Sequence, residues 1–382
     1  MTDRLRIQFC DHLSIMRGKY LPASKIGDDE SRFAQPTFAV HYDKDLLLEA
    51  PGTKCLQGIP DMTLRWKAAE IRQGWEPNTK VVTGDLYLAD GTPLPLCARG
   101  ALKRAVADWE RHGLTPKIGI ELEAYAFTRN ADGSIVPYDA PGGVVYGTGN
   151  FSDPRRFTDA IWNKAQEIGL PLDLITSEYD NPQFEFTLSF DDAVAHVDTV
   201  VLFRQMAREV ALDHGIILTF LPKPFAKKGG SGMHINLSFS DANGKNALAN
   251  GDRGDPAAMN ALAQGSVAGW MRHHQGLAGL IAPNALSYAR LQPSSLSGYW
   301  CNWRRQPQCD SAPVSRGRQE GAAGTPDGRC GGQSLHGGRG GIAGGAAGVC
   351  GRLSVATDGN RRWFHRQRRA LWRGCQPDRG AG

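Results

Sequence analysis

The stretch that decides the fold lies near the middle of the chain and reads Ile118-Gly119-Ile120-Glu121-Leu122-Glu123-Ala124-Tyr125. Successive side chains of a β-strand point to opposite faces, so the two glutamates share one face and the apolar residues that alternate with them share the other. The apolar side predicts a core behind the strand. The acidic side indicates either a solvated surface or a site that uses carboxylates.

Two further segments show the same alternation, Gln183-Phe184-Glu185-Phe186-Thr187-Leu188 and Met233-His234-Ile235-Asn236-Leu237-Ser238-Phe239. An antiparallel sheet with one wet face gives this pattern without any site, and that is the alternative for any single strand. The polar faces, however, differ from the Lys, Thr and Arg mixture of a solvated surface. They carry Glu121, Glu123, Gln183, Glu185, His234, Asn236 and Ser238.

These side chains have the chemistry of a divalent-metal site. Carboxylates with one imidazole and no thiolate suit Mg²⁺ or Mn²⁺, and Mg²⁺ in proteins most often holds phosphates. Crowded carboxylates repel one another unless cations lie among them. The residues therefore predict a nucleotide-using active site on a curved sheet, without naming its reaction.

The rest of the body reads as an α+β protein. Residues 1–98 hold short strand-like pieces broken by Pro and Gly, and residues 100–112 read as a helix. Two further helices are expected at residues 153–169 and 191–215. We expect a boundary between two domains at the first of these helices.

Composition excludes several classes of protein. The 382 residues, 41% of them hydrophobic, are enough for one large or two modest globular domains. No apolar run reaches the roughly 18 to 20 residues of a membrane span, and the start of the chain lacks a signal-peptide core. Eight cysteines without a Cys-x-x-Cys pair support neither a disulfide scaffold nor a structural zinc. We expect a soluble, cytoplasmic protein without a membrane partner.

Residues 304–382 form a tail of different character. They hold 14 Arg, no Lys, 5 acidic residues and 18 of the 46 Gly, so the tail carries a formal charge of +9 and the first 303 residues carry −4. The tail has almost no apolar periodicity, and we expect it to be disordered. One interpretation is an Arg/Gly-rich arm that binds nucleic acid.

Four segments resemble, in order, the motifs of the glutamine synthetase family, which includes the γ-glutamyl-amine ligases. Gly119–Glu123 is similar to its Glu-x-Glu strand, and Glu178–Glu185 to its Glu-x(4)-Gln-x-Glu segment. Gly230–Ser238 resembles its Gly-Ser-Gly-Met-His-x-His-x-Ser stretch, and Pro283–Leu291 its Asn-Ser-Tyr-x-Arg-Leu run. The resemblance spans residues 5–303.

The resemblance implies an ATP-dependent ligase. Glutamate's γ-carboxylate would attack the γ-phosphate of ATP, and ammonia or an organic amine would then displace phosphate from γ-glutamyl phosphate. Mg²⁺ or Mn²⁺ ions would neutralise the two anions. The matching positions imply that Glu123, Glu178 and Glu185 bind the ion beside glutamate, and that Glu121 and His234 bind the ion at the ATP phosphates. They also imply that Gly230 and the catalytic Arg290 contact glutamate. Asn236 and Ser238 would lie at the nucleotide.

Departures from the family pattern bear on activity. Asn236 stands where the family has a second His, and Gly229 where it has Asn. Leu296 stands where ammonia-using members carry a glutamate that shields the acyl phosphate and helps to deprotonate ammonium. Relatives without that glutamate accept bulkier amines, so the resemblance favours an organic amine. For the ammonium-binding aspartate, only residues 43–45 offer a candidate.

The tail lacks the Asn-Arg pair and the Glu-x-Arg strand that the family places beyond residue 303. Read one nucleotide later, the codons that residues 304–309 allow permit Gly-Asp-Asn-Arg-Asn, and those of residues 322–327 permit Arg-Leu-Glu-His-Arg-Met. We therefore interpret residues 304–382 as a frameshifted reading of a ligase gene. A GC-rich gene read out of frame yields Gly and Arg, so this interpretation displaces the nucleic-acid arm, and no nucleic-acid partner is expected.

The expected architecture is a small N-terminal β-grasp-like domain at residues 1–107 and an incomplete glutamine synthetase-like catalytic domain at residues 108–303, with a curved antiparallel sheet and flanking helices. Family members form ring homo-oligomers with active sites between subunits, which we expect here only if the C-terminal half folds. Without its in-frame motifs the chain is expected to be catalytically impaired. A non-catalytic pseudoenzyme is the alternative, and a phosphagen-kinase-like phosphotransferase is a third hypothesis that the Met-His strand disfavours.

Overall fold

The structure is a computed structural model that describes residues 3–27, 29–248, 260–282 and 284–291, together with the backbone of residues 312–315 and 321–325. The side chains of residues 271, 274 and 275 are not described. Leu296 and the remainder of the 304–382 tail lie outside the described residues. The expected disorder of the tail and its frameshifted origin therefore stay predictions.

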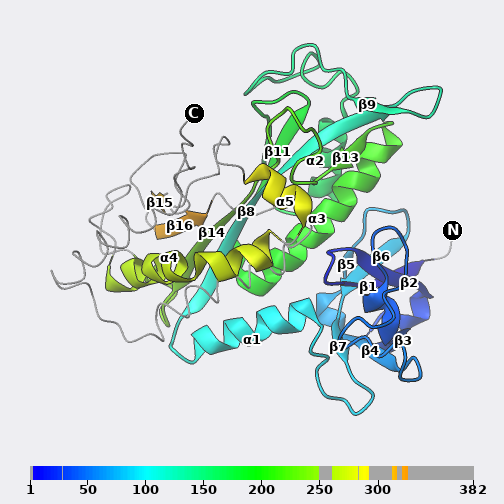
Figure 1. Ribbon diagram of the computed structural model, residues 1–382, viewed down its shortest axis with the longest axis vertical. Coiled ribbons are helices and arrows are strands. Elements are labelled where there is room, and N and C mark those ends of the chain that lie inside the picture. The colour runs from blue at the N-terminus through cyan, green and yellow to red at the C-terminus, as the bar shows by residue number, and fades with distance from the viewer. Residues whose placement is uncertain are drawn as a thin grey trace, which may run out of the picture.

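The N-terminal part contains two small sheets that share one core (Figure 1). Alternate residues of the first strand, Leu5 and Ile7, are fully buried and pack in the same cluster as Met62 and Leu64 of the second sheet. The first sheet contains β1 (Arg4–Cys10), β2 (Met16–Pro22), β5 (Arg72–Gln73) and β6 (Thr79–Thr83), the second contains β3 (Asp29–Ala34), β4 (Asp61–Trp66) and β7 (Asp85–Tyr87), and three short 3-10 helices, η1 (Ala23–Lys25), η2 (Gln35–Ala39) and η3 (Ala68–Glu70), lie between strands.

A nine-stranded antiparallel sheet forms the second part, and its main path runs β10-β11-β8-β14-β16-β15. The long strand β8 (Thr115–Arg129) is its spine, because five other strands pair with it. The other strands are β9 (Ile135–Pro137), β10 (Leu172–Ser177), β11 (Gln183–Leu188), β12 (Asp191–Asp192), β13 (Ile217–Thr219), β14 (Met233–Ser240), β15 (Ala312–Ser315) and β16 (Gly321–Thr325). Of the last two, β16 pairs with β14 and β15 pairs with β16, so both add short pieces of the tail to that edge of the sheet.

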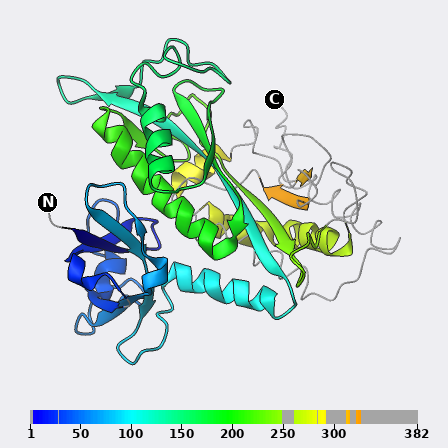
Figure 2. The ribbon, with the colours of Figure 1, turned by 180° about the vertical axis from the view of Figure 1, so that it is seen from behind.

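Helices cover the sheet on one face and approach it on the other. Figure 2 shows α2 and α3 against the sheet on the near side, whereas Figure 1, from the opposite side, shows α5 in front of β8. The helices are α1 (Ala98–Glu110), α2 (Phe157–Glu167), α3 (Ala193–Asp213), α4 (Ala261–Ile281) and α5 (Ala285–Arg290). Within the described ranges, no helix is long and apolar enough to cross a membrane.

The alternation along β8 is confirmed by its burial. Ile118, Ile120, Leu122 and Ala124 are fully buried in the cluster that contains α3, and the glutamates between them point to the opposite face. The α+β class is confirmed as well. The second helix begins at Phe157, later than expected, because Arg156 before it has a left-handed backbone (φ 54°) that a right-handed helix cannot include. Asp153 accepts hydrogen bonds from the Thr158 amide and hydroxyl in the first turn of this helix.

The two parts of the molecule meet at α1 and α3. Arg99 of α1 lies between carboxylates of both parts, Glu70 and Asp85 from the N-terminal part and Asp198 from α3. Arg6 of β1 reaches Glu209 of α3 with a distance of 2.9 Å between Nη2 and Oε1. These contacts tie the small sheets to the helix that supports the large sheet.

Candidate active site

The strand register brings the predicted ligands onto one face of the large sheet. Glu123 on β8 lies directly opposite Glu185 on β11, and Glu121 lies directly opposite His234 on β14. Glu121, Glu185 and His234 each offer one ligand atom, and these three atoms lie within 4.8 Å of one another. Side chains from three adjacent strands are therefore close enough to share one ion. We refer to this face, with Glu123 and Glu178, as the acid face.

Glu121 connects the acid face to β14. His234 Nδ1 lies 2.9 Å from Glu121 Oε2, and Asn236 Nδ2 donates to Glu121 Oε1 over 3.3 Å. A carboxylate only accepts, so the Nδ1 of His234 carries the proton in this contact. Asn236, which stands in place of a second His, thus orients a carboxylate in this structure.

Glu123 is oriented from the other side of the acid face. Its Oε2 accepts from Gln183 Nε2 over 2.9 Å and from the Gly232 amide over 2.8 Å. The neighbouring Glu178 follows β10, and its Oε2 accepts from the Tyr179 amide over 3.1 Å. Glu123 and Glu178 are thus each held by at least one neutral donor and keep further oxygen lone pairs for a ligand.

Burial and neighbouring charges disfavour the ionised forms of two acid-face carboxylates, Glu178 and Glu185. Burial, followed by the charges of Glu121, Glu123 and Glu178, raises the pKa of Glu185 to about 7. Burial and then the charge of Glu123 raise the pKa of Glu178. Burial would lower the pKa of His234, but the hydrogen bond to Glu121 and the surrounding carboxylates raise it. A cation among these groups would relieve the repulsion.

The predicted glutamate contacts lie next to the acid face. Arg290, the last residue of α5, is 8% exposed and crosses over Gly230, where a Cβ would lie only 2.5 Å from the Arg290 Cγ. At Gly232, a Cβ would lie 2.8 Å from Glu123 Oε1 and 3.2 Å from Arg290 Nη2. The absence of side chains at both glycines lets a guanidinium and a carboxylate approach the same loop.

Two other candidates lie farther from the ligands. Ser238 is on the same face of β14 as His234, four residues along the strand, which corresponds to about 13 Å. Asp43 lies in an exposed loop of the N-terminal part, where its carboxylate accepts from the Asp45 amide. None of the contacts described for Asp43 joins it to the acid face.

Sequence reasoning missed Tyr125 and Asp180. Tyr125 donates its hydroxyl to the Gly229 carbonyl over 3.1 Å, and Asp180 accepts from the Gly229 amide. The alternation that placed Glu121 and Glu123 together also places Tyr125 on their face, so that signal was present. Asp180 lies in a loop between strands, and no periodicity points to it.

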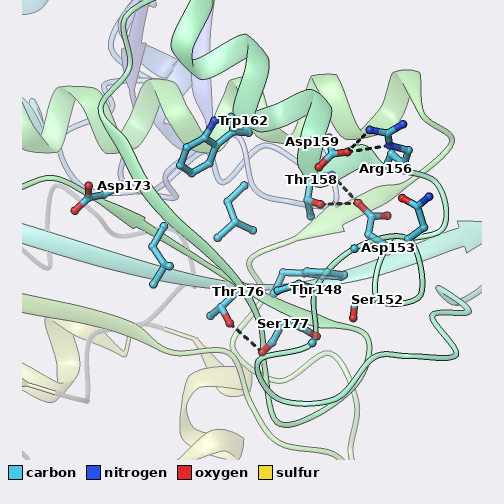
Figure 3. A pocket seen from close by; sticks show the side chains of 16 residues that line it. Thr148, Ser152, Asp153, Arg156, Thr158, Asp159, Trp162, Asp173, Thr176 and Ser177 are labelled. Atoms are coloured by element: carbon cyan, nitrogen blue, oxygen red, sulfur yellow. Dashed lines mark hydrogen bonds and ion pairs between the residues drawn. The ribbon is translucent and has the colours of Figure 1, made fainter.

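A separate cavity of about 380 Å³ lies between α2, β10 and the loop of residues 147–153 (Figure 3). Asp153 at its rim accepts from the Tyr138 hydroxyl, and Asp159 pairs with Arg156 at 2.8 Å. None of the predicted site residues lines this cavity. These acids cap and brace α2, so the cavity does not compete with the acid face as the candidate site.

Comparison with known proteins agrees with this geometry. The family described as "Glutamine synthetase, catalytic domain" matches residues 95–310. The chain belongs to the glutamine synthetase family. A crystal structure described as that of a novel glutamine synthase homolog superimposes with a TM-score of 0.79 at 21% identity, covering 94% of this chain and 85% of the other. The fold is thus confirmed as that of the family.

Relatives of this chain include glutamine synthetases and ligases that are named for an organic amine. The glutamine synthetase of Pyrococcus woesei is 28% identical over 302 residues, which is 78% of this chain and 64% of that protein. The glutamate–methylamine ligase of Methyloversatilis universalis is 31% identical over 223 residues, 57% of this chain and 49% of that protein. The chain thus spans less than two thirds of the length of these two relatives.

Proposed function

We propose that this chain derives from an ATP-dependent ligase that joins the γ-carboxylate of glutamate to an organic amine or ammonia through γ-glutamyl phosphate. One observation carries the proposal, namely that ligand atoms of Glu121, Glu185 and His234 from three strands lie within 4.8 Å of one another. Family membership supports the same reaction class.

The residues of the acid face fit Mg²⁺ or Mn²⁺. Carboxylate oxygens and one imidazole are the ligands these ions accept, and the raised pKa of Glu185 reflects a charge excess that a divalent cation would offset. By the resemblance, Glu123, Glu178 and Glu185 would hold an ion beside glutamate, and Glu121 and His234 one at the ATP phosphates. The ligand atom of Glu185 lies within 4.8 Å of those of Glu121 and His234, so Glu185 is within reach of the second ion as well. When bound, such ions offset the charge of the phosphates and of the attacking carboxylate.

The chain's own groups would bind and orient the substrates. The guanidinium of Arg290 is nearly buried beside Gly230 and Gly232, so it can pair with a carboxylate of glutamate in a setting where that pairing is strong. Asn236 and Ser238, on the polar face of β14, would contact the nucleotide. The acceptor amine would then attack the acyl phosphate that glutamate forms with the γ-phosphate of ATP, and phosphate would leave.

We propose an organic amine as the preferred acceptor. Leu296, outside the described residues, has no carboxylate with which to deprotonate ammonium, and the resemblance associates that loss with bulkier amines. The likeness to a glutamate–methylamine ligase supports this choice. The protein would act in the cytoplasm, and it would assemble into rings only if its C-terminal half folds.

In its present reading the chain would be catalytically impaired. Strand β16, which pairs with β14 beside His234 and Asn236, reads Gly321-Ala322-Ala323-Gly324-Thr325 and brings no carboxylate to that edge. We propose that the in-frame gene supplies the missing metal ligand and phosphate arginine from this region. A non-catalytic pseudoenzyme that keeps the fold and binds ligands is the second candidate, favoured by the same strand.

The test compares the chain as written with a version whose reading frame is restored by one nucleotide after the Trp303 codon. Titration calorimetry measures Mn²⁺ binding, and phosphate release is followed with ATP, glutamate and a panel of amines. We expect both proteins to bind Mn²⁺ and only the restored one to turn over, faster with methylamine than with ammonia. Glu185→Gln should weaken Mn²⁺ binding, and Glu167→Gln, on the exposed face of α2, should not.

Each other result has a definite meaning. Turnover by the chain as written at the rate of the restored protein would contradict the impairment. Mn²⁺ binding without phosphate release by either protein would favour the pseudoenzyme. Failure of both to bind Mn²⁺ would remove the metal site and the ligase proposal with it.

A further inference from the structure

The loop of residues 229–232, which leads into β14, is held by side chains of two neighbouring strands. Gln183 of β11 donates from Nε2 to the Gly230 carbonyl over 3.2 Å. On β8, Glu123 accepts from the Gly232 amide over 2.8 Å, and the Tyr125 hydroxyl donates to the Gly229 carbonyl over 3.1 Å. The loop and the acid face therefore form one hydrogen-bonded unit.

Asp180 anchors the start of this loop. Its Oδ2 accepts the amide hydrogen of Gly229, and its carboxylate also contacts the hydroxyl of Tyr125. Tyr125 and Asp180 thus hold the two sides of the same residue, one through its carbonyl and the other through its amide.

Gly229 and Asp180 are matched in shape. A Cβ at residue 229 would lie 2.6 Å from Asp180 Oδ2, so any side chain there would displace the carboxylate. Gly229 stands where the family pattern has Asn. The carboxylate of Asp180 therefore fills space next to the backbone that a side chain at residue 229 would otherwise take.

We propose that Asp180 is a positioning residue for glutamate binding, which it supports by fixing Gly229 so that Gly230 and Gly232 lie against Arg290 and Glu123. The inference rests on the proposed function, because glutamate is the ligand proposed at Gly230 and Arg290. Asp180 acts as a hydrogen-bond acceptor for the loop backbone and does not touch the substrate. The side chain of Asp180 fills the place of the Asn side chain that the family pattern has at position 229 and that this chain lacks.

The experiment measures glutamate affinity by titration calorimetry on the full chain with saturating Mn²⁺. Asp180→Ala removes the acceptor and should weaken glutamate binding about tenfold. Asp180→Asn keeps an acceptor oxygen and should restore the affinity to within about threefold of the original chain. The affinity for Mn²⁺ itself should stay within about twofold in both variants, and Asp173→Ala, an exposed aspartate on β10, should change neither affinity.

A double-mutant cycle tests the shape match. Gly229→Ala should weaken glutamate binding in the original chain, because the methyl group displaces Asp180. In the Asp180→Ala background the same change should have little further effect, since the carboxylate is already absent. Additive losses would show that the two residues act independently and would overturn the inference.

The outcomes separate this inference from the proposed function. If the original chain binds Mn²⁺ and no glutamate, the proposed ligase site fails and the inference with it. If the chain binds glutamate and Asp180→Ala binds it equally well, only the inference is overturned. If Asp180→Asn binds as weakly as Asp180→Ala, the negative charge matters instead of the acceptor geometry, and the positioning role is wrong. If Asp180→Ala loses Mn²⁺ binding through misfolding, Tyr125→Phe, which releases the other side of Gly229, replaces it with the same criteria.

Discussion

The cluster around Arg99 and the acid face both bring several carboxylates together. The first pairs them with an arginine of the protein, and the second offers them to a bound cation. Arg99 places its Nη1 2.7 Å from Asp85, its Nη2 2.8 Å from Glu70 and its Nε 3.0 Å from Asp198. A cation thus occupies the centre of three carboxylates. On the acid face, four glutamates lie near one imidazole, and the Arg290 guanidinium approaches only the Glu123 side of the group.

The pKa directions express this difference. Burial would raise the pKa of Asp85, but the charges of Arg99 and Lys103 hold it below its ordinary value. The pKa of Glu185 instead rises to about 7, because burial and neighbouring carboxylates act in the same direction. The first cluster has its cation built in and serves the junction between the two parts of the molecule, although burial outweighs the charge of Arg99 at Asp198 and raises the pKa of that carboxyl. The second has more carboxylates than His234 and the nearby Arg290 offset, and this excess of negative charge is typical of a cation-binding site.

The largest expected effect is the loss of the internal cation. Arg99→Met should destabilise the protein by about 3–5 kcal/mol, because it leaves the buried carboxylate of Asp198 without its partner. Chemical denaturation at neutral pH measures the change. The control is Arg65→Met, whose exposed pairing with Glu30 should be worth less than about 1 kcal/mol. Equal losses in the two variants would contradict the distinction.

On the acid face, removing a charged group should stabilise the fold instead of destabilising it. The folded-state pKa of Glu185, about 7, lies above its ordinary value of 4.5, so its contribution to stability is present below pH 4.5 and is lost as the pH rises to 7. Without metal at pH 8, Glu185→Gln should therefore stabilise the fold, by about 1–3 kcal/mol at most. Thermal unfolding with and without Mn²⁺ measures this.

With Mn²⁺ bound, the original chain should be more stable than the Glu185→Gln variant. The ion should stabilise the original chain by mass action and the Glu185→Gln variant far less, since a missing ligand weakens binding. A variant that is less stable than the original chain in the absence of metal would show that the carboxylate is satisfied by the protein alone. That result would make the acid face a second structural cluster.

His196 offers an intermediate case, a buried group that avoids charge altogether. Its Nε2 accepts from the Ile120 amide over 2.9 Å, its Nδ1 lies 3.1 Å from the Ser189 carbonyl, and burial lowers its pKa from 6.5 to about 4. The unfolded chain binds the extra proton first, so stability from this group is present above pH 6.5 and is lost as the pH falls toward 4.

The contribution of His196 can be isolated by a difference measurement. Between pH 7 and pH 5, the original chain should lose about 2 kcal/mol more unfolding free energy than His196→Gln. Urea denaturation at both pH values gives the comparison, and carboxylates that titrate in both proteins cancel. Parallel pH profiles would mean that folding does not lower the pKa of His196.

The smallest expected effect is at the edge of the Arg99 cluster. Lys103 lies 2.6 Å from Asp85, but its side chain is 46% exposed. Lys103→Met should therefore cost less than about 1 kcal/mol, and added salt should reduce the difference further. A loss comparable to that of Arg99→Met would show that the cluster depends on total charge and not on its buried centre.

The acid face could be read from the sequence because its residues repeat with the period of a strand. The two-residue spacing of Glu121 and Glu123 predicts that they share one face of a strand, and the structure confirms that alternation. The meeting of Glu121 with His234 depended on pairing between distant strands, which the family resemblance supplied and periodicity alone did not. Arg99 gave no signal, since an arginine in an amphipathic helix normally faces water, and its partners lie 14, 29 and 99 residues away.

Local rules also left some boundaries open. Asp153 followed by Pro154 pointed to a helix start there, whereas the left-handed backbone of Arg156 delays the start of α2 to Phe157. Asp180 and Gly229 are 49 residues apart, and only the fold shows that one fills the space left by the other. Such complementarity is a property of packing and is invisible to a linear pattern.

The strand β8 limits how this protein can change. Its even-numbered residues from Ile118 to Ala124 are fully buried in the hydrophobic core, and the odd-numbered Glu121 and Glu123 carry the proposed chemistry. An insertion or deletion of a single residue within that stretch would exchange the two sets, exposing the core and burying the acids in one event. Variation in substrate preference must therefore arise in the loops that surround β8, while the strand itself can accept only replacements that preserve its length.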